Sequence, residues 1–244
     1  MEKKCAIRME NITKRFGSKV IANKDVNLDL YEGEILSLLG ENGSGKTTLM
    51  NMLSGIYFPD EGQIYVHDQP VTIASPKDAF DLGIGMIHQH FKLVDIFTAT
   101  ENIILGLEGK LDLNSARQKV KDICQKYGFD IDPDMKIYDM SVSQKQTVEI
   151  VKVLFRGADI LILDEPTAVL TPQETDKLFA VMRNMKNDGK SLIIITHNAK
   201  ILEGLHVDYV HVLDDAHIVR TGDGSLVNEI IEEGFRALKE DEAK

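Results

Sequence analysis

Two stretches near the N-terminus alternate apolar and polar residues. The pattern covers residues 5–12 and 20–32 and is typical of half-buried antiparallel strands. Residues 14–17 are predicted to form the turn between these strands. A second turn is predicted at 59–62, where Pro-Asp-Glu-Gly leads into a strand over residues 63–67.

Later strands are predicted from apolar runs without alternation. Residues 159–163 and 191–196 are apolar almost throughout, as expected for strands buried on both faces of a parallel sheet. Shorter strands are predicted at 34–39 and 83–87. The chain is therefore predicted to have an α/β fold with a parallel core and an antiparallel β subdomain.

Helical periodicity replaces these patterns over residues 89–140. Thr98 and Glu101 have the spacing of a capping box, which predicts a helix start. A second helix is predicted to end at Gly128, a residue suited to the left-handed cap of a helix. The apolar positions of this second helix recur every three or four residues: Ala116, Val120, Ile123, Cys124 and Tyr127.

Two more helices are predicted in the last third of the chain. The first begins at residues 171–174, where Thr-Pro-Gln-Glu supplies an N-cap, a first-turn proline and a closing glutamate. Its apolar stripe consists of Leu178, Val181, Met182 and Met185. The tail over 226–244 is predicted to be amphipathic, interrupted at Gly234, and packed on the core through Val227, Ile230, Ile231, Phe235 and Leu238.

Composition narrows the classes of function. The 244 residues carry a net charge of −11, and the basic residues do not cluster, which argues against a nucleic-acid partner. Two cysteines give no disulfide framework or metal spacing, which fits a reducing cytoplasm. No apolar run approaches the ~20 residues of a membrane span, and no signal-peptide pattern is present.

The strongest chemical motif follows the strand at 34–39. It reads Gly40-Glu41-Asn42-Gly43-Ser44-Gly45-Lys46-Thr47 and fits the phosphate-binding loop G-x-x-x-x-G-K-[ST]. Glycines let successive N–H groups turn toward phosphate oxygens. Lys46 is expected to contact the β- and γ-phosphates, and the Thr47 hydroxyl to ligate Mg²⁺. Thr48, the next residue, is assigned to the same nucleotide site.

A second motif supplies acidic groups. The apolar strand at 160–163 ends in Asp164 and Glu165. A carboxylate in the position of Asp164 can hold Mg²⁺ beside the phosphate loop. Glu165 is expected to orient or deprotonate the attacking water.

In this order and spacing, the motifs resemble those of the ATP-binding cassette (ABC) ATPases over nearly the whole chain. The resemblance implies a P-loop NTPase (RecA-like) core that binds ATP and Mg²⁺. It also implies that Phe16 stacks on adenine and that Gln89 contacts Mg²⁺ and the attacking water. His197 would lie at the γ-phosphate, and Asp164 and Glu165 would be the metal-binding and catalytic acids.

The same resemblance implies a domain organisation. An ABC ATPase domain over 1–225 would comprise core segments 1–88 and 141–225 and an inserted helical subdomain over 89–140. The tail over 226–244 would follow it. The stretch over 89–106 would receive the cytoplasmic helix of a membrane permease.

Two positions depart from the family pattern. The signature LSGGQ reads Met140-Ser141-Val142-Ser143-Gln144 here, so both glycines are replaced. In the family this segment contacts the nucleotide held by the opposite subunit, and the roles carry over to Ser141, Ser143 and Gln144. The Ser143 side chain is expected to crowd that contact and slow turnover. Thr171 stands where the family has an aspartate, and we interpret it as a helix N-cap.

The finer resemblance is to importers of simple sugars and nucleosides. Residues 164–174 are typical of the first ATPase half of these proteins, and residues 88–94 look closest to the nucleoside branch. This implies permease subunits, a second ATPase domain and, indirectly, a substrate-binding protein as partners. It also implies a peripheral location on the inner face of the cell membrane. A homodimer, a separate partner half and a fragment of a two-ATPase chain all stay open.

Two other functions and one other site are weighed. A non-transport ABC ATPase is expected to carry a coiled-coil insertion or a basic surface, and this chain has neither. An ATP-gated assembly module with weak turnover fits the altered signature, but Glu165 and His197 argue against it. His88 and His90 flank Gln89 as a possible metal pair, for which no third ligand is evident nearby.

Overall fold

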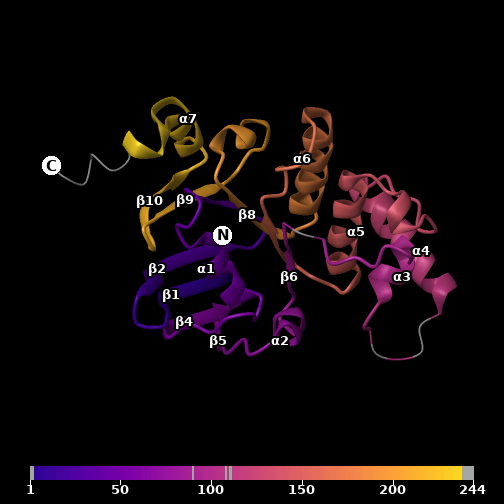
Figure 1. Ribbon diagram of the computed structural model, residues 1–244, viewed down its shortest axis with the longest axis horizontal. Coiled ribbons are helices and arrows are strands. Elements are labelled where there is room, and N and C mark those ends of the chain that lie inside the picture. The colour runs from indigo at the N-terminus through magenta and orange to yellow at the C-terminus, as the bar shows by residue number, and fades with distance from the viewer. Residues whose placement is uncertain (1–2, 90, 108, 110–111, 238–244) are drawn as a thin grey trace.

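The computed structural model describes residues 3–237 except 90, 108, 110 and 111. Two sheets lie side by side, and a group of helices extends from the larger one (Figure 1). The helices are α1 (Lys46–Leu53), α2 (Pro76–Asp81), α3 (Ala99–Ile104), α4 (Leu113–Tyr127), α5 (Val142–Phe155), α6 (Pro172–Asn187) and α7 (Leu226–Ala237), with 3-10 turns η1 (Ile137–Asp139) and η2 (Ala199–Gly204).

The smaller sheet is antiparallel and has the order β2-β1-β4-β5. Its strands are β1 (Cys5–Phe16), β2 (Val20–Tyr31), β4 (Glu61–Val66) and β5 (Gln69–Val71). The predicted pair of alternating strands is thus confirmed. The predicted turn over 59–62 is wrong in its second half, because β4 already begins at Glu61.

The turn predicted over 14–17 is also wrong. Residues 14–16 continue β1, and Phe16 pairs with Val20. The cause is a distant acid: Asp60 accepts hydrogen bonds from the Arg15 N–H at 2.6 Å and from Lys14 Nζ at 3.0 Å. These bonds hold the chain extended, and the reversal occurs only over residues 17–19.

The larger sheet has the order β10-β9-β3-β8-β7-β6. Its strands are β3 (Ile35–Leu39), β6 (Ile84–Ile87), β7 (Ile160–Asp164), β8 (Ser191–Thr196), β9 (Tyr209–Asp214) and β10 (His217–Asp223). All neighbours are parallel except β10 against β9. Every residue of β3, β7 and β8 is buried, which confirms the prediction of strands covered on both faces. The α/β fold is confirmed, and β9 and β10 are additions to the predicted strands.

The predicted helix ends are confirmed, and each is formed by residues next to it in the sequence. Capping boxes are present at Thr98 and Thr171, and Gly128 closes α4 at φ 86°. In α7, Val227 and Ile230 are buried, and Gly234 interrupts the helix at φ 76°. Of the predicted apolar stripe, Leu238 and the Phe235 side chain lie outside the described part of the chain.

Helix α5 links the helical group to the larger sheet. One side of α5 contributes to the sheet core through residues such as Ile150 and Val153. The other side packs with α3 and α4 through Val148, Val151 and Phe155. Figure 1 shows α3 and α4 at the far end of the molecule, beyond α5. The orientation of the helical group is therefore set mainly by one helix.

A buried histidine predicts acid sensitivity of this fold. His211 on β9 is 7% exposed, and its Nδ1 lies 2.7 Å from Thr221 Oγ1. Burial lowers the pKa of His211 from 6.5 to about 4, because a charged imidazole is disfavoured there. Between these two pKa values, His211 is therefore mostly protonated in the unfolded chain and mostly neutral in the folded chain. Stability from this group is complete above pH 6.5 and is lost as the pH falls toward 4.

We expect this loss to reach about 3 kcal/mol of unfolding free energy across that window. Urea unfolding at half-unit pH steps, with wild-type protein and His211→Gln, measures it. The variant should show a shallower decline between pH 6.5 and 4. Parallel declines in the two proteins would show that His211 titrates normally in the folded state.

Candidate functional site

The phosphate-binding loop, residues 40–47, joins β3 to α1. A Cβ on Gly40 would lie 2.1 Å from the Leu213 carbonyl oxygen, and one on Gly45 would lie 2.1 Å from the Ala22 carbonyl oxygen. These contacts exclude any side chain at the two glycines. Strands from both sheets therefore pack directly against the loop and fix its shape.

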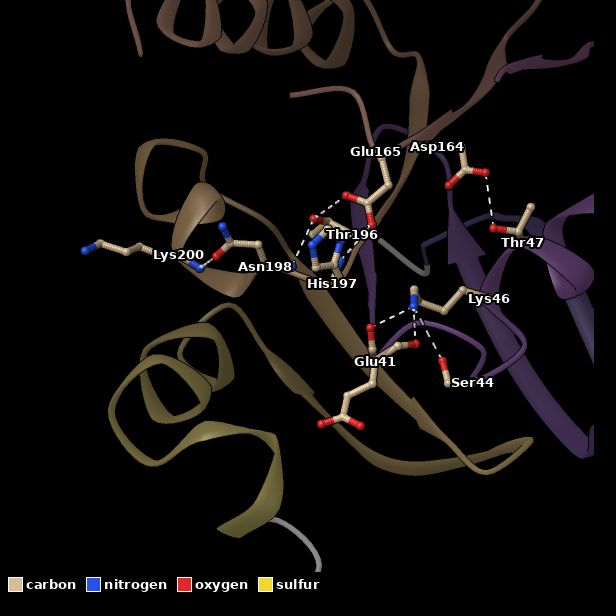
Figure 2. Close-up of polar contacts among 11 residues, drawn as sticks. Glu41, Ser44, Lys46, Thr47, Asp164, Glu165, Thr196, His197, Asn198 and Lys200 are labelled. Atoms are coloured by element: carbon tan, nitrogen blue, oxygen red, sulfur yellow. Dashed lines mark hydrogen bonds and ion pairs between the residues drawn. The ribbon is translucent and has the colours of Figure 1, made fainter. Parts of the chain in front are cut away.

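The amine of Lys46 lies inside this loop. Nζ donates to the carbonyl oxygens of Gly40 at 2.7 Å and Glu41 at 2.8 Å, and it lies 3.5 Å from Ser44 Oγ (Figure 2). Burial lowers the pKa of Lys46, and the acids Glu165, Asp164 and Glu41 oppose that shift through space. The loop thus holds a buried amine among neutral oxygens, where phosphate groups would supply the missing negative charge.

Thr47 and Asp164 form an oxygen pair beside the loop. The Thr47 hydroxyl donates to Asp164 Oδ2 at 3.2 Å. Burial at the end of β7 raises the pKa of Asp164. A buried carboxylate next to a hydroxyl fits Mg²⁺, which prefers oxygen ligands and would compensate the buried charge. The described residues therefore fit the metal that the motifs imply.

Glu165 is held more firmly than the sequence indicates. Its backbone is left-handed at φ 48°, a strained conformation for a non-glycine residue. Oε2 accepts from Thr196 Oγ1 at 3.0 Å, and Oε1 accepts from the His197 N–H at 2.9 Å and lies 2.6 Å from His197 Nδ1. Figure 2 shows Thr196 and His197 converging on this carboxylate. These contacts fix the orientation of the Glu165 carboxylate.

A cavity of about 540 Å³ gathers most of the predicted nucleotide-site residues. Those lining it are Phe16, Asn42, Gly43, Gly45, Lys46, Thr47, Thr48, Gln89, Asp164, Glu165 and His197. Gly40, Glu41 and Ser44 instead contact the Lys46 amine from within the loop. The side chains of Val20 and Ile21 also line the cavity and are half exposed.

Phe16 borders this cavity at the end of β1. Its ring meets Tyr57 edge to face, with centroids 5.1 Å apart, and is 39% exposed. An exposed aromatic ring with a fixed edge contact offers a stacking face for a planar base. The adenine-stacking role of Phe16 stays a prediction that this geometry permits.

The signature residues lie elsewhere. Ser141, Ser143 and Gln144 border a different cavity, of about 350 Å³, together with residues of α6. Ser141 caps α5, where its hydroxyl accepts from the Gln144 N–H at 3.3 Å. One chain therefore does not bring these residues to its own phosphate loop. Their predicted contact with a nucleotide on another subunit stays a prediction.

Two residues that contact the site or the segment after it were not predicted from the sequence. Thr196 binds Glu165, and its signal was a polar residue closing an apolar strand directly before His197. Gln146 is buried and donates from Nε2 to the Pro166 carbonyl oxygen at 2.7 Å. Its signal was a polar residue at helical spacing from Ile150 on the core side of α5. Of the proposed histidine pair, His90 lies outside the described residues.

Comparison with known proteins places these features in a family. The profile of the family described as "ABC transporter" matches residues 23–168. The nucleoside import ATP-binding protein NupA of Lactococcus lactis subsp. cremoris is 54% identical over 201 residues, covering 81% of this chain and 40% of NupA. The guanosine import ATP-binding protein NupO of Bacillus subtilis is 54% identical over 191 residues, covering 77% of this chain and 37% of NupO. The chain spans about two fifths of the length of these relatives.

Among solved structures, a dimeric bacterial ABC transporter cassette has a TM-score of 0.77 and 25% sequence identity. The match covers 89% of this chain and 98% of that cassette. The two sheets and the helical group described above are therefore the fold of an ABC cassette.

The exposed ring of Phe16 generates a prediction about nucleotide selectivity. Stacking contributes contact area without reading base edges, so Phe16→Ala should weaken ATP and GTP binding alike, each by about tenfold. Equilibrium binding with fluorescent analogues of both nucleotides measures this. Phe58→Ala is the matched control, since Phe58 is 48% exposed and does not line the cavity. Loss of one nucleotide alone would show that Phe16 does not act by stacking.

Proposed function

The chain belongs to the ABC transporter family, and on that premise we propose that it is the ATP-hydrolysing subunit of an importer that drives uptake of a nucleoside. The observation that carries the proposal is the shared cavity of Lys46, Asp164 and Glu165. A nucleoside is favoured over a simple sugar because both relatives compared above are named for nucleoside or guanosine import.

Different side chains of the cavity would bind the base, the phosphates and the metal ion of Mg-ATP. In our proposal the Phe16 ring carries the adenine, and Lys46 moves from its carbonyl partners to the β- and γ-phosphates. Thr47, Asp164 and Gln89 would hold Mg²⁺, which would neutralise phosphate charge. These groups position the γ-phosphate before any bond changes.

Glu165 then acts on water. Its carboxylate orients a water molecule in line with the γ-phosphate and accepts a proton as the new P–O bond forms and the bond to ADP breaks. The Thr196 hydroxyl and the His197 N–H donate to this carboxylate and hold it in place. The His197 side chain is half exposed and lines the same cavity, where its ring can turn toward the γ-phosphate.

A second ATPase domain completes the site in this proposal. The signature residues border their own cavity, away from the phosphate loop of the same chain. They are therefore available to a nucleotide bound by a partner domain, which would be a second copy of this chain or a separate half. The dimeric cassette supports such pairing by its similarity.

The proposed contact with a permease lies on the helical group. Ile96 is 69% exposed and Tyr138 is 61% exposed, and both lie close to the segment that follows Gln89. Exposed apolar side chains of this size mark interaction surfaces. Among the described residues, no helix is long and apolar enough to cross a membrane. The chain would reach the inner face of the cell membrane through permease subunits, with a substrate-binding protein acting on their other side.

Uptake by cells tests the proposed function. In a strain lacking this gene, wild-type protein should restore uptake of labelled guanosine or adenosine. Glu165→Gln should lower that uptake at least about 100-fold, because it removes the proton acceptor. Glu203→Gln, which alters an exposed acid on η2, is the control and should behave as wild type.

Three results would contradict the proposal, each at a different point. Nucleoside uptake that is independent of the gene would remove the importer function. Wild-type uptake by Glu165→Gln would remove the role of that carboxylate. Restoration of ribose uptake alone would assign the importer to simple sugars instead.

A further inference from the structure

The helices that follow the two altered motifs begin with the same arrangement. At α5, Ser141 and Gln144 form a capping box, and at α6, Thr171 and Glu174 form another. Each box satisfies N–H groups that have no partner within the helix. Taken alone, the two boxes only explain where the helices start.

A side-chain bridge joins the two boxes. The Ser143 hydroxyl donates to Glu174 Oε1 at 2.6 Å. The other oxygen of the same carboxylate, Oε2, accepts from the Thr171 N–H and Oγ1, both at 2.9 Å. Ser143 Oγ also lies 3.1 Å from Ser141 Oγ. A continuous path of hydrogen bonds therefore runs from the start of α6 to the signature serine.

Helix α5 is attached to the same region at a second point. Gln146, one turn further along, is buried and donates to the Pro166 carbonyl oxygen at 2.7 Å. Pro166 directly follows Glu165, and Glu174 lies in the first turn of α6. The segment between Glu165 and α6 is thus tied to α5 at both of its ends.

The bridge is strongest when the Glu174 carboxylate is ionised. The hydrogen bond from Ser143 is the main cause that lowers the pKa of Glu174, followed by the bonds from Thr171, and Lys177 adds to the effect. Charge-assisted hydrogen bonds are shorter and stronger than neutral ones. A glycine at position 143 has no hydroxyl and cannot form this bond.

We propose that Glu174 is a positioning residue, which acts through the Ser143 hydroxyl to hold residues 141–144 in fixed orientation to the segment after Glu165. This inference rests on the proposed function, in which residues 141–144 face a nucleotide on a second ATPase domain. It assigns the serine of the altered signature a constructive role, in place of the crowding expected from the sequence. In a pair of ATPase domains, each chain would supply Glu165 to one nucleotide site and residues 141–144 to the other. The bridge therefore couples the positions of these two segments within one chain.

Steady-state ATP hydrolysis by the assembled complex provides the main test. Ser143→Ala and Glu174→Ala should each lower kcat about tenfold and leave the KM for ATP within about twofold, since the bridge orients the signature without binding the monomer's own nucleotide. The double variant should be no slower than the slower single variant, because both changes break the same bond. Asp176→Asn, which alters an acid in the same helix outside the bridge, is the control.

The results separate a bridge from a steric defect. If the losses in kcat of the two single variants multiplied in the double variant, the two side chains would act independently and the proposal would be overturned. Faster turnover by Ser143→Ala would also overturn it, because the hydroxyl would then not support catalysis. Ser143→Thr retains the hydroxyl and should restore most of the rate. Restoration by Thr but not by Ala would not follow from simple crowding, since Thr is the larger side chain.

A structural readout keeps the proposal separate from the proposed function. Carbon-13 NMR of labelled glutamate reports the Glu174 carboxyl titration in the full chain without ATP. The pKa of Glu174 should rise in Ser143→Ala and stay unchanged in Asp176→Asn. An unchanged Glu174 pKa in Ser143→Ala would overturn the bridge itself. A shifted pKa in a complex that never hydrolyses ATP would instead refute the proposed function.

Discussion

The buried amine of Lys46 is the constraint on which the rest of the site depends. An ammonium group taken out of water needs compensating partners, and the described residues supply it with neutral loop oxygens as direct contacts. Those carbonyls point inward because the loop turns tightly between β3 and α1. The turn is possible because glycines stand where the backbones of β2 and β9 approach most closely. Both sheets are thereby needed to hold one amine where phosphate can reach it.

The acids opposite this amine follow from strand geometry. Parallel strands end at the same edge of a sheet, so the ends of β7 and β8 bring Asp164, Glu165 and His197 beside the loop. The left-handed backbone at Glu165 stores strain that the contacts from Thr196 and His197 stabilise. The Glu165 carboxylate is therefore held in one orientation by residues of its own chain. The signature segment begins α5, the helix that also carries the helical group. We propose that the phosphate loop and the signature segment of one chain serve two different nucleotide sites, so that a single chain forms half of a working enzyme.

Sequence reasoning succeeded where the determining chemistry is local. The phosphate loop, the capping boxes at Thr98 and Thr171, and the buried strands were all predictable from neighbouring residues. It failed where distant residues decide the conformation. Asp60, which directly precedes the neighbouring strand β4, keeps Lys14 and Arg15 extended, so the predicted turn at 14–17 moved to 17–19. The hydrogen bond between Ser143 and Glu174 joins residues 31 positions apart, and no sequence pattern predicts it. The expectation that Ser143 crowds the signature contact was drawn from local residues alone, and it stays a prediction.

The central claim is that one chain holds ATP through its loop cavity alone, while its signature segment serves another site. Calorimetric titration of Mg-ATP into the isolated chain tests this most directly, with Lys46→Ala and Ser141→Ala compared at concentrations where light scattering shows a monomer. We expect Lys46→Ala to raise the dissociation constant about 100-fold, because charged hydrogen bonds to phosphate are lost. Ser141→Ala should leave the dissociation constant within about twofold of wild type. If Ser141→Ala raised the dissociation constant of the monomer as much as Lys46→Ala does, the signature segment would belong to the nucleotide site of its own chain.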